Sequence, residues 1–396
     1  MAKDKRLSSH FKYSNKFIYI GAIILTIYGF FMIISAEMGE SSGDLNTITN
    51  SSLRLIIYMI IGFLSMIILS LDKFAALFRK FFKIAYIVVL FLLLITRAFG
   101  AVGGAYAWIR LGPISFQPSE FAKIVIIVVA SKLFSETSSK DPKRNFWTFV
   151  IYSLIYVVIV AFYQHDFGTA LVIAAISFAC ALVSPNKRIR YLQNRMLIIL
   201  FAGIIIFGFL ISPIGTKLLE NFSSSYQINR FLASANPFAY EYDSGYHLIM
   251  SLISFATGGI FGVGYGQSIH KYMNFPNPST DFILPVIIEE MGIAFGLVPI
   301  VLCYGFIIGP LIFYSYKSNN TSDKIIVLGT FMYFVCHIIL NIGGVTGLIP
   351  LTGVPLLLLS SGGTSLISCL ACLGLSQYSI INYKRNKDKE NEDSSR

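Results

Sequence analysis

Long apolar runs recur along the whole chain, and short polar segments separate them. We expect ten of these runs to be transmembrane helices, because a hydrocarbon layer about 30 Å thick needs roughly 20 apolar residues per helical span. The predicted spans are residues 17–35, 53–71, 81–98, 118–133, 146–163, 169–184, 196–213, 284–314, 325–345 and 352–382. The pattern therefore predicts an all-α polytopic membrane protein, with a ten-helix domain over residues 17–383 between an N-terminal tail (1–16) and a C-terminal tail (384–396).

Composition and charge agree with a bilayer environment. The 396 residues are 55% hydrophobic and 13% charged, whereas soluble domains are about 25% charged. Of the 31 Lys and Arg residues, 24 fall in alternate loops on the side of the N-terminus. Cytoplasmic loops retain such residues, so we expect both termini in the cytoplasm. Anionic lipid head groups account for the net charge of +11, and no nucleic-acid partner is expected.

One loop is much longer than the others: residues 214–283, between the seventh and eighth spans on the outer side. Its apolar stretch 246–262 is too short and too rich in glycine for an eleventh span, and it predicts an interfacial or re-entrant helix. The glycines from Gly258 to Gly266 suit either a turn at the membrane surface or a phosphate-binding loop, and we favour the turn. The short charged tail from Lys384 to Arg396 is expected to be disordered.

Several charged residues lie within or next to predicted spans, where each costs roughly 2.5–3.5 kcal/mol and so requires a reason. Structural explanations exist for most of them: a local ion pair between Glu120 and Lys123, a helix cap at Asp166 or Asp281, or an ion pair of Arg230 with Glu241 or Asp243. All of them, however, fall toward the outer half of the membrane. This shared depth predicts one site at the outer leaflet, for an amphiphilic substrate with a lipid tail and a phosphate-bearing head. The residues are Glu120, Lys123, Asp166, Arg230, Asp281, Glu289 and Glu290.

At these positions the sequence resembles the SEDS (shape, elongation, division and sporulation) family of polytopic peptidoglycan glycosyltransferases. Two local departures accompany the resemblance: His165 replaces a frequent proline, and Ser361 stands where tyrosine is usual. The segments that carry it are Trp108 with Gln117–Lys123, Asp166–Thr169, Gly245–Gly266 with Pro278–Ile283 and Glu289–Gly292, and Asn341–Pro355 with Ser360–Ser365.

The resemblance implies an enzyme of the bacterial cytoplasmic membrane that polymerises lipid II into glycan strands at the outer face. Asp281 matches the family aspartate proposed to deprotonate the acceptor hydroxyl, and cationic groups or a divalent cation (Mg²⁺ or Mn²⁺) would stabilise the departing pyrophosphate. No cofactor beyond such a cation is expected. The candidate substrate-binding residues are Trp108, Glu120, Lys123, Asp166, Arg230, Glu289, Glu290 and Ser361.

The same resemblance implies protein partners: a single-span transpeptidase of the penicillin-binding class, and other division or elongation proteins. The character of the termini and of the last motif of the resemblance, Asn341–Ser365, favours the division type over the elongation type. Two other functions fit a ten-helix chain, namely a lipid II flippase and a noncatalytic division scaffold. A transporter typically has its site near the midplane, between repeats. The charges here lie toward one face, which favours the enzyme.

Overall fold

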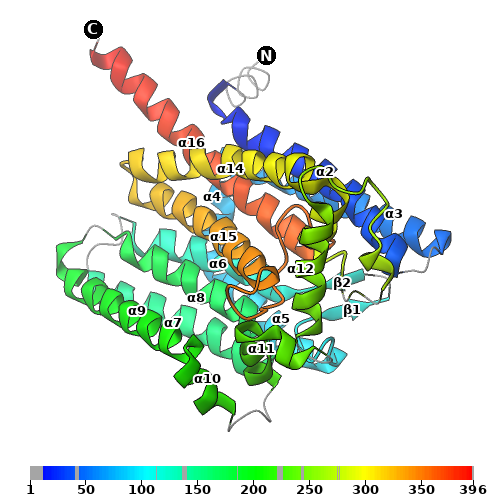
Figure 1. The fold of residues 1–396 in the computed structure, drawn as a ribbon. Helices are drawn as coiled ribbons and strands as arrows, with labels where there is room; N and C mark the ends of the chain where they lie inside the picture. Colours follow the sequence, from blue (N-terminus) through cyan, green and yellow to red (C-terminus); the bar gives the residue numbers. More distant parts are fainter. Residues whose placement is uncertain are drawn as a thin grey trace.

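The computed structural model describes residues 12–40, 44–112, 114–135, 141–184, 186–220, 226–241, 245–273, 275 and 277–394. These residues are mostly helical (Figure 1). The helices that correspond to predicted spans are α2 (Lys16–Glu40), α3 (Leu45–Ser70), α5 (Phe82–Ile95), α6 (Pro118–Leu133), α7 (Pro142–Val158), α8 (Phe167–Leu182), α9 (Arg190–Ile211), α13 (Ile283–Gly292), α14 (Val298–Lys317), α15 (Thr321–Val345) and α16 (Gly363–Ser394). The remaining α-helices are α4 (Asp72–Lys80), α10 (Pro213–Glu220), α11 (Tyr226–Ala235) and α12 (Tyr246–Gly258).

The helices confirm the predicted polytopic fold. Among the described residues, eight helices or helix pairs are long and apolar enough to cross a membrane, and α13 and α14 form one of them through a π-helical segment, Ile293–Leu297. The other two predicted spans are α6 and α8, of 16 residues each, about 24 Å long at 1.5 Å per residue. Each of the ten predicted spans therefore overlaps a helix.

Two predictions for the C-terminal end were wrong: the start of the last span and the disorder of the tail. The last span does not begin at residue 352, because residues 346–362 are not helical and α16 starts only at Gly363. Pro350 and Pro355 break a helix, and Gly353 has a φ of +69°, which is incompatible with one. The tail is not disordered up to Ser394 either, because α16 continues through it. Its Lys, Arg and Glu residues are good helix formers.

The interior of the bundle is formed by α6, α8, α15 and α16, which pack against one another. Helix α6 is buried almost throughout, from Pro118 to Ser131. The outer helices present large apolar side chains instead: on α9, Ile198, Ile199 and Phe201 are each about two-thirds exposed. Such a surface is unfavourable in water and suits lipid.

The long loop of residues 214–283 contains a helix over the stretch for which the sequence predicts an interfacial or re-entrant one. Helix α12, of 13 residues, runs across the direction of α2 and α14 (Figure 1). The backbone after it lies directly against α13: the amides of Val263 and Gly264 donate to the carbonyls of Glu289 and Glu290, each at 2.9 Å. A Cβ atom at Gly262 would overlap the Glu290 carbonyl. The glycines thus serve close backbone packing, which supports the turn interpretation and not a phosphate-binding loop.

The two ends of the described chain lie on the same side of the bundle (Figure 1). The Asn15 amide donates to Gln377 Oε1 at 2.9 Å, and Lys384 Nζ donates to the Ser14 carbonyl at 3.2 Å. At the opposite end, a two-stranded hairpin that the sequence did not predict, β1 (Ile109–Leu111) and β2 (Ile114–Phe116), precedes α6.

Candidate active site

Asp281 lies in a turn immediately before α13, at the end of the bundle opposite to the termini. The amides of Thr280 and Phe282 donate to the Asn277 carbonyl, at 3.1 and 3.3 Å. Asn277 has a φ of +48°, a conformation that asparagine tolerates. The residue that caps α13 is Phe282, with no side-chain cap. The Asp281 carboxylate is therefore not used as a helix cap, and it remains partly exposed.

Residues 351–355, which we call the closing segment, connect the parts of the site. Since this segment is not helical, its carbonyl groups are available to side chains from other elements. They accept hydrogen bonds from Arg230 (Nη1 to Leu351 O, 3.2 Å), Asn341 (Nδ2 to Val354 O, 3.0 Å) and His337 (Nδ1 to Pro355 O, 2.8 Å).

The same segment lies against the Asp281 carboxylate and against the start of α8. A Cβ atom built on Gly353 would lie 3.5 Å from Asp281 Oδ2. The Thr352 carbonyl packs so closely on Gly168, at the start of α8, that no side chain fits there. Asn341 also donates to the main-chain carbonyl of Asp281 at 2.8 Å. One irregular segment thus holds Asp281 close to α8, which Asp166 caps.

Asp281 lies close enough to Arg230 and Asp166 for both charges to affect its ionisation. Burial, which disfavours the carboxylate, raises the pKa of Asp281 to about 6; the Arg230 guanidinium lowers it and the Asp166 carboxylate raises it further. Burial likewise raises the pKa of Asp166. A carboxylic acid with a pKa near neutrality is suited to general base catalysis.

Asp166 also has a structural role, as the cap predicted from the sequence. Its Oδ1 accepts the Thr169 amide at 3.0 Å, and its Oδ2 accepts Gln117 Nε2 at 3.1 Å. The preceding His165 has a φ of +60°, which the proline ring cannot adopt. The backbone at residue 165 therefore has a conformation that proline could not form.

Lys123 and Glu120 form the predicted ion pair, with 2.6 Å between Lys123 Nζ and Glu120 Oε1. Both are at most 1% exposed. His337 Nε2 lies 2.9 Å from Lys123 Nζ, and Tyr333 donates to Glu120 Oε2 at 2.7 Å. Because His337 Nδ1 faces the Pro355 carbonyl and must donate, Nε2 is the acceptor of the lysine proton. The structure thus places Lys123 and Glu120 inside the bundle, where they support the site through His337; their contact with substrate stays a prediction.

Glu289 and Glu290 are also placed differently from the prediction of one shared site. Their carboxylates bind the loop that follows α12: His270 Nδ1 lies 2.7 Å from Glu289 Oε1, and Lys271 Nζ lies 2.7 Å from Glu290 Oε1. Ser35 of α2 donates to the same Glu290 carboxylate at 2.7 Å. Both glutamates are fully buried. They form a second cluster, two helical turns from Asp281, that fixes the loop to α13 and α2.

The two remaining predicted residues border the site. Ser361 lies beside the turn of Asp281, since its amide donates to the Ser279 carbonyl at 2.9 Å. Trp108 is partly exposed just before β1, and the hairpin meets the start of α16 where Thr364 Oγ1 accepts the Gln117 amide at 3.3 Å. Neither position contradicts a role in substrate binding.

The donor set for a divalent cation is limited. Within the described parts of the chain, no three His, Cys, Asp or Glu side chains converge as metal ligands. Asp281 and Asp166 are two hard oxygen donors near each other, and Mg²⁺ is commonly held by one or two carboxylates together with substrate phosphates. The residues therefore fit a cation that arrives with a pyrophosphate, and not a preformed protein cage.

Sequence reasoning missed three side chains of the site: Gln117, His337 and Asn341. A usable signal was present for the last two. They lie four residues apart in a predicted span and therefore on one helix face, and polar residues inside a span mark functional regions. The closing segment gave no such signal, because its main-chain carbonyls make the contacts.

Comparisons with known proteins agree with this architecture. The family model described as cell cycle protein, which covers FtsW, RodA and SpoVE, matches residues 15–386. The chain is 30% identical over 393 residues to the probable peptidoglycan glycosyltransferase FtsW of Bacillus subtilis (strain 168), covering 98% of this chain and 95% of that protein. It is 29% identical to stage V sporulation protein E of the same organism, covering 89% and 93%.

Solved structures show the same fold. A chain of a peptidoglycan synthase complex that coordinates polymerization and crosslinking superposes with a TM-score of 0.70 at 24% identity, covering 93% of this chain and 98% of that one. The rod shape determining protein RodA of Thermus thermophilus superposes with a TM-score of 0.63 at 23% identity, covering 92% and 96%.

Proposed function

The chain belongs to the FtsW, RodA and SpoVE family of cell cycle proteins, and from this membership and the site geometry we propose that it is a peptidoglycan glycosyltransferase that polymerises lipid II. The observation that carries the proposal is Asp281: a partly exposed carboxylate with a pKa raised to about 6, beside the Arg230 guanidinium. A base and a fixed cation close together are what a transfer from a pyrophosphate leaving group requires.

In the reaction, the hydroxyl oxygen of the acceptor sugar attacks the anomeric carbon of the donor on the face opposite to the pyrophosphate. Asp281 accepts the hydroxyl proton as the new glycosidic bond forms. The bond from the anomeric carbon to the pyrophosphate oxygen breaks, and the lipid pyrophosphate leaves with the electron pair. Inversion follows from this single displacement, so no second carboxylate is needed as a nucleophile.

Arg230 is the candidate for stabilising the negative charge that develops on the pyrophosphate. Its guanidinium is held by the Leu351 carbonyl at 3.2 Å. Arginine binds phosphate oxygens with two parallel hydrogen bonds, which also orients the leaving group. A divalent cation bound through Asp281, Asp166 and the substrate would supply further neutralisation of that charge.

The experiment is a polymerisation assay with purified protein, a penicillin-binding transpeptidase and lipid II, analysed by gel separation of the glycan products. Asp281→Asn is compared with Glu241→Gln, which neutralises an exposed carboxylate in the same outer loop. We expect at least a hundredfold loss for Asp281→Asn and an unchanged rate for Glu241→Gln, with both variants folded and bound to the partner. Full activity of Asp281→Asn would refute the assignment of the base. No polymer from the wild type, with or without Mg²⁺ or Mn²⁺, would favour the flippase.

The cellular role proposed is division, in the cytoplasmic membrane, with both termini in the cytoplasm. Support comes from the relatives named FtsW, from the two chain ends on one side of the bundle, and from the excess of Lys and Arg on that side. Polymerisation and crosslinking are coordinated in the synthase complex whose chain shares this fold. We accordingly propose a penicillin-binding transpeptidase as the partner here, together with other division proteins. Depletion of the chain that stops elongation and leaves septation intact would refute the division role.

A further inference from the structure

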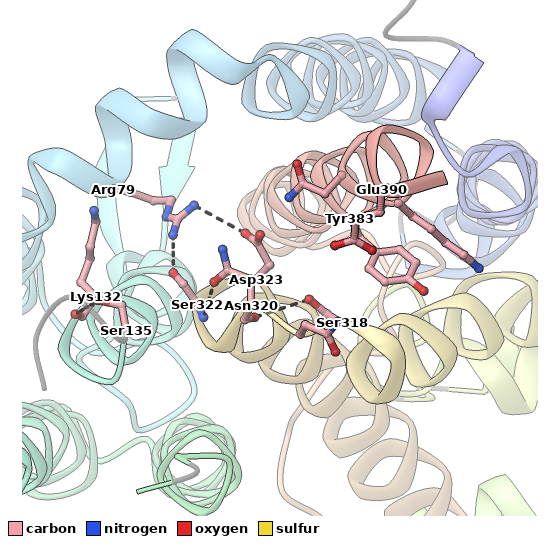
Figure 2. A pocket seen from close by; sticks show the side chains of 12 residues that line it. Arg79, Lys132, Ser135, Ser318, Asn320, Ser322, Asp323, Tyr383 and Glu390 are labelled. Atoms are coloured by element: carbon pink, nitrogen blue, oxygen red, sulfur yellow. Dashed lines mark hydrogen bonds and ion pairs between the residues drawn. The ribbon is translucent and has the colours of Figure 1, made fainter. Parts of the chain in front are cut away.

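A polar cavity of about 670 Å³ lies at the end of the bundle opposite to Asp281. It is bordered by the C-terminal ends of α4 and α6, the turn between α14 and α15, and the extended part of α16 (Figure 2). Asp323 at this cavity and Asn341 at the active site are 18 residues apart on α15, about 27 Å at 1.5 Å per residue. The cavity is therefore separate from the proposed catalytic centre.

Positive charge exceeds negative charge around the cavity. Three cations line it, Arg79, Lys132 and Lys387, against two carboxylates, Asp323 and Glu390. Arg79 and Asp323 offset each other, with 3.6 Å between Nη1 and Oδ1. Figure 2 shows the Arg79 guanidinium directed at α15, and Lys132 at the border formed by α6. Glu390 offsets one of the two lysines, so Lys132 and Lys387 together leave one net positive charge for a ligand to meet.

Neutral hydrogen-bonding groups and the N-terminal end of a helix also line the cavity. The lining includes the Ser322 hydroxyl and the Asn319 amide, which can donate to an anion. The hydroxyls of Ser135 and Ser318 line it too, but they donate to the carbonyls of Lys132 and Asn320. Helix α15, of 25 residues, begins at the cavity, and its positive end favours negative charge. The Ser322 amide is already bound by the Asn320 side chain at 2.9 Å. The ligand would therefore be held by side chains and the helix field, and not by that amide.

From this lining we propose that the cavity binds a phosphate-bearing anion. A phosphate group offers several acceptor oxygens around one centre, which matches the three cations and the Ser322 hydroxyl that four different helices contribute to the lining. The cavity lies at the level where helices end, and basic pockets between membrane helices at this depth bind anionic lipid head groups. A phosphate ester dissolved in the cytoplasm has the same chemistry, and the experiment separates the two sources.

The experiment measures binding to the purified full-length protein in neutral detergent by thermophoresis. The probes are dihexanoylphosphatidylglycerol, dihexanoylphosphatidylcholine and sn-glycerol 3-phosphate. The test variant is Lys132→Gln/Lys387→Gln, and the matched control is Lys73→Gln/Lys83→Gln, which removes two exposed lysines from the same side of the protein. For the test variant we expect roughly tenfold weaker binding of the two anionic probes, phosphatidylglycerol and glycerol 3-phosphate, because two charge-assisted hydrogen bonds are lost. For the control variant we expect less than a twofold change.

Binding of phosphatidylglycerol alone identifies a lipid head group, and binding of glycerol phosphate as well identifies a phosphate ester in general. Equal losses in the test and control variants, or binding of phosphatidylcholine as tight as that of phosphatidylglycerol, would each overturn the proposal. Unchanged lipid II polymerisation shows that the test variant is folded. If it does not fold, Asn319→Asp replaces it, since this exposed side chain tolerates a new charge and the added carboxylate should weaken phosphate binding.

Discussion

Replacing Asp281 with asparagine should stabilise the protein while abolishing polymerisation. The fold raises the pKa of this carboxyl group from its ordinary value of 3.8 to about 6, so the folded state disfavours the carboxylate that the unfolded state prefers. Two pKa units correspond to about 3 kcal/mol. The part of Asp281 that stays exposed to solvent lowers this to about 1–3 kcal/mol. The pKa of about 6 already includes the attraction of the Arg230 guanidinium, which opposes the increase caused by burial.

Because folding raises the pKa of Asp281, its effect on stability depends on pH in a defined direction. Above pH 6 the folded protein carries the full cost of the ionised carboxylate; between pH 6 and 3.8 the cost decreases, and below 3.8 it is absent because both states are protonated. The assay is thermal unfolding of wild type and Asp281→Asn from pH 4 to 8, with Glu241→Gln as the exposed control. A gain in stability that is largest at pH 7 or above and vanishes near pH 4 is expected. A variant that is less stable than wild type at pH 7.5, or a difference independent of pH, would refute the reasoning.

Other changes test the surroundings of this carboxylate. Lys123→Met leaves the buried Glu120 carboxylate without its cation and should lower the free energy of unfolding by about 3–5 kcal/mol. The double variant Glu120→Gln/Lys123→Met should recover most of this loss in denaturant titrations. Gly353→Ala requires a left-handed alanine and should cost about 1–2 kcal/mol, with slower polymerisation in the same assay. Asp166→Asn removes a charge that raises the pKa of Asp281, so the acidic limb of the profile of kcat/KM against pH should move to lower pH.

Most of the transmembrane architecture could be predicted from hydrophobicity alone, because the bilayer imposes a minimum apolar length on each span. The method fails where this constraint is weak. Residues 352–362 are largely apolar yet not helical, whereas the short interior helices α6 and α8 were correctly predicted as spans. Proline and glycine in this segment override its hydrophobicity. The helical tail of α16 shows the converse, since charged residues form a helix when a long helix precedes them and Lys384 contacts Ser14.

The sequence predicted only some of the residues that lie together at the site. Asp281, Arg230 and Asp166 share one electrostatic environment, as their common depth suggested. The same reasoning grouped Glu289 and Glu290 with them incorrectly, because depth in the membrane does not specify the direction of a side chain. These two glutamates face the loop after α12, in which Lys271 supplies the countercharge for Glu290. Tertiary partners of this kind are far apart in sequence and leave no local pattern.

The closing segment explains how the carboxylate that we propose as the base can be disfavoured by burial and still be placed accurately. A helix would use its own carbonyl groups internally, whereas residues 351–355 offer them to Arg230, Asn341 and His337. Through His337, the segment is bound to the buried Lys123–Glu120 pair. A fixed irregular backbone of this kind can hold a cation and a carboxylate at the membrane boundary without placing either on a mobile loop. Accurate positioning of Asp281 therefore depends on buried groups inside the bundle.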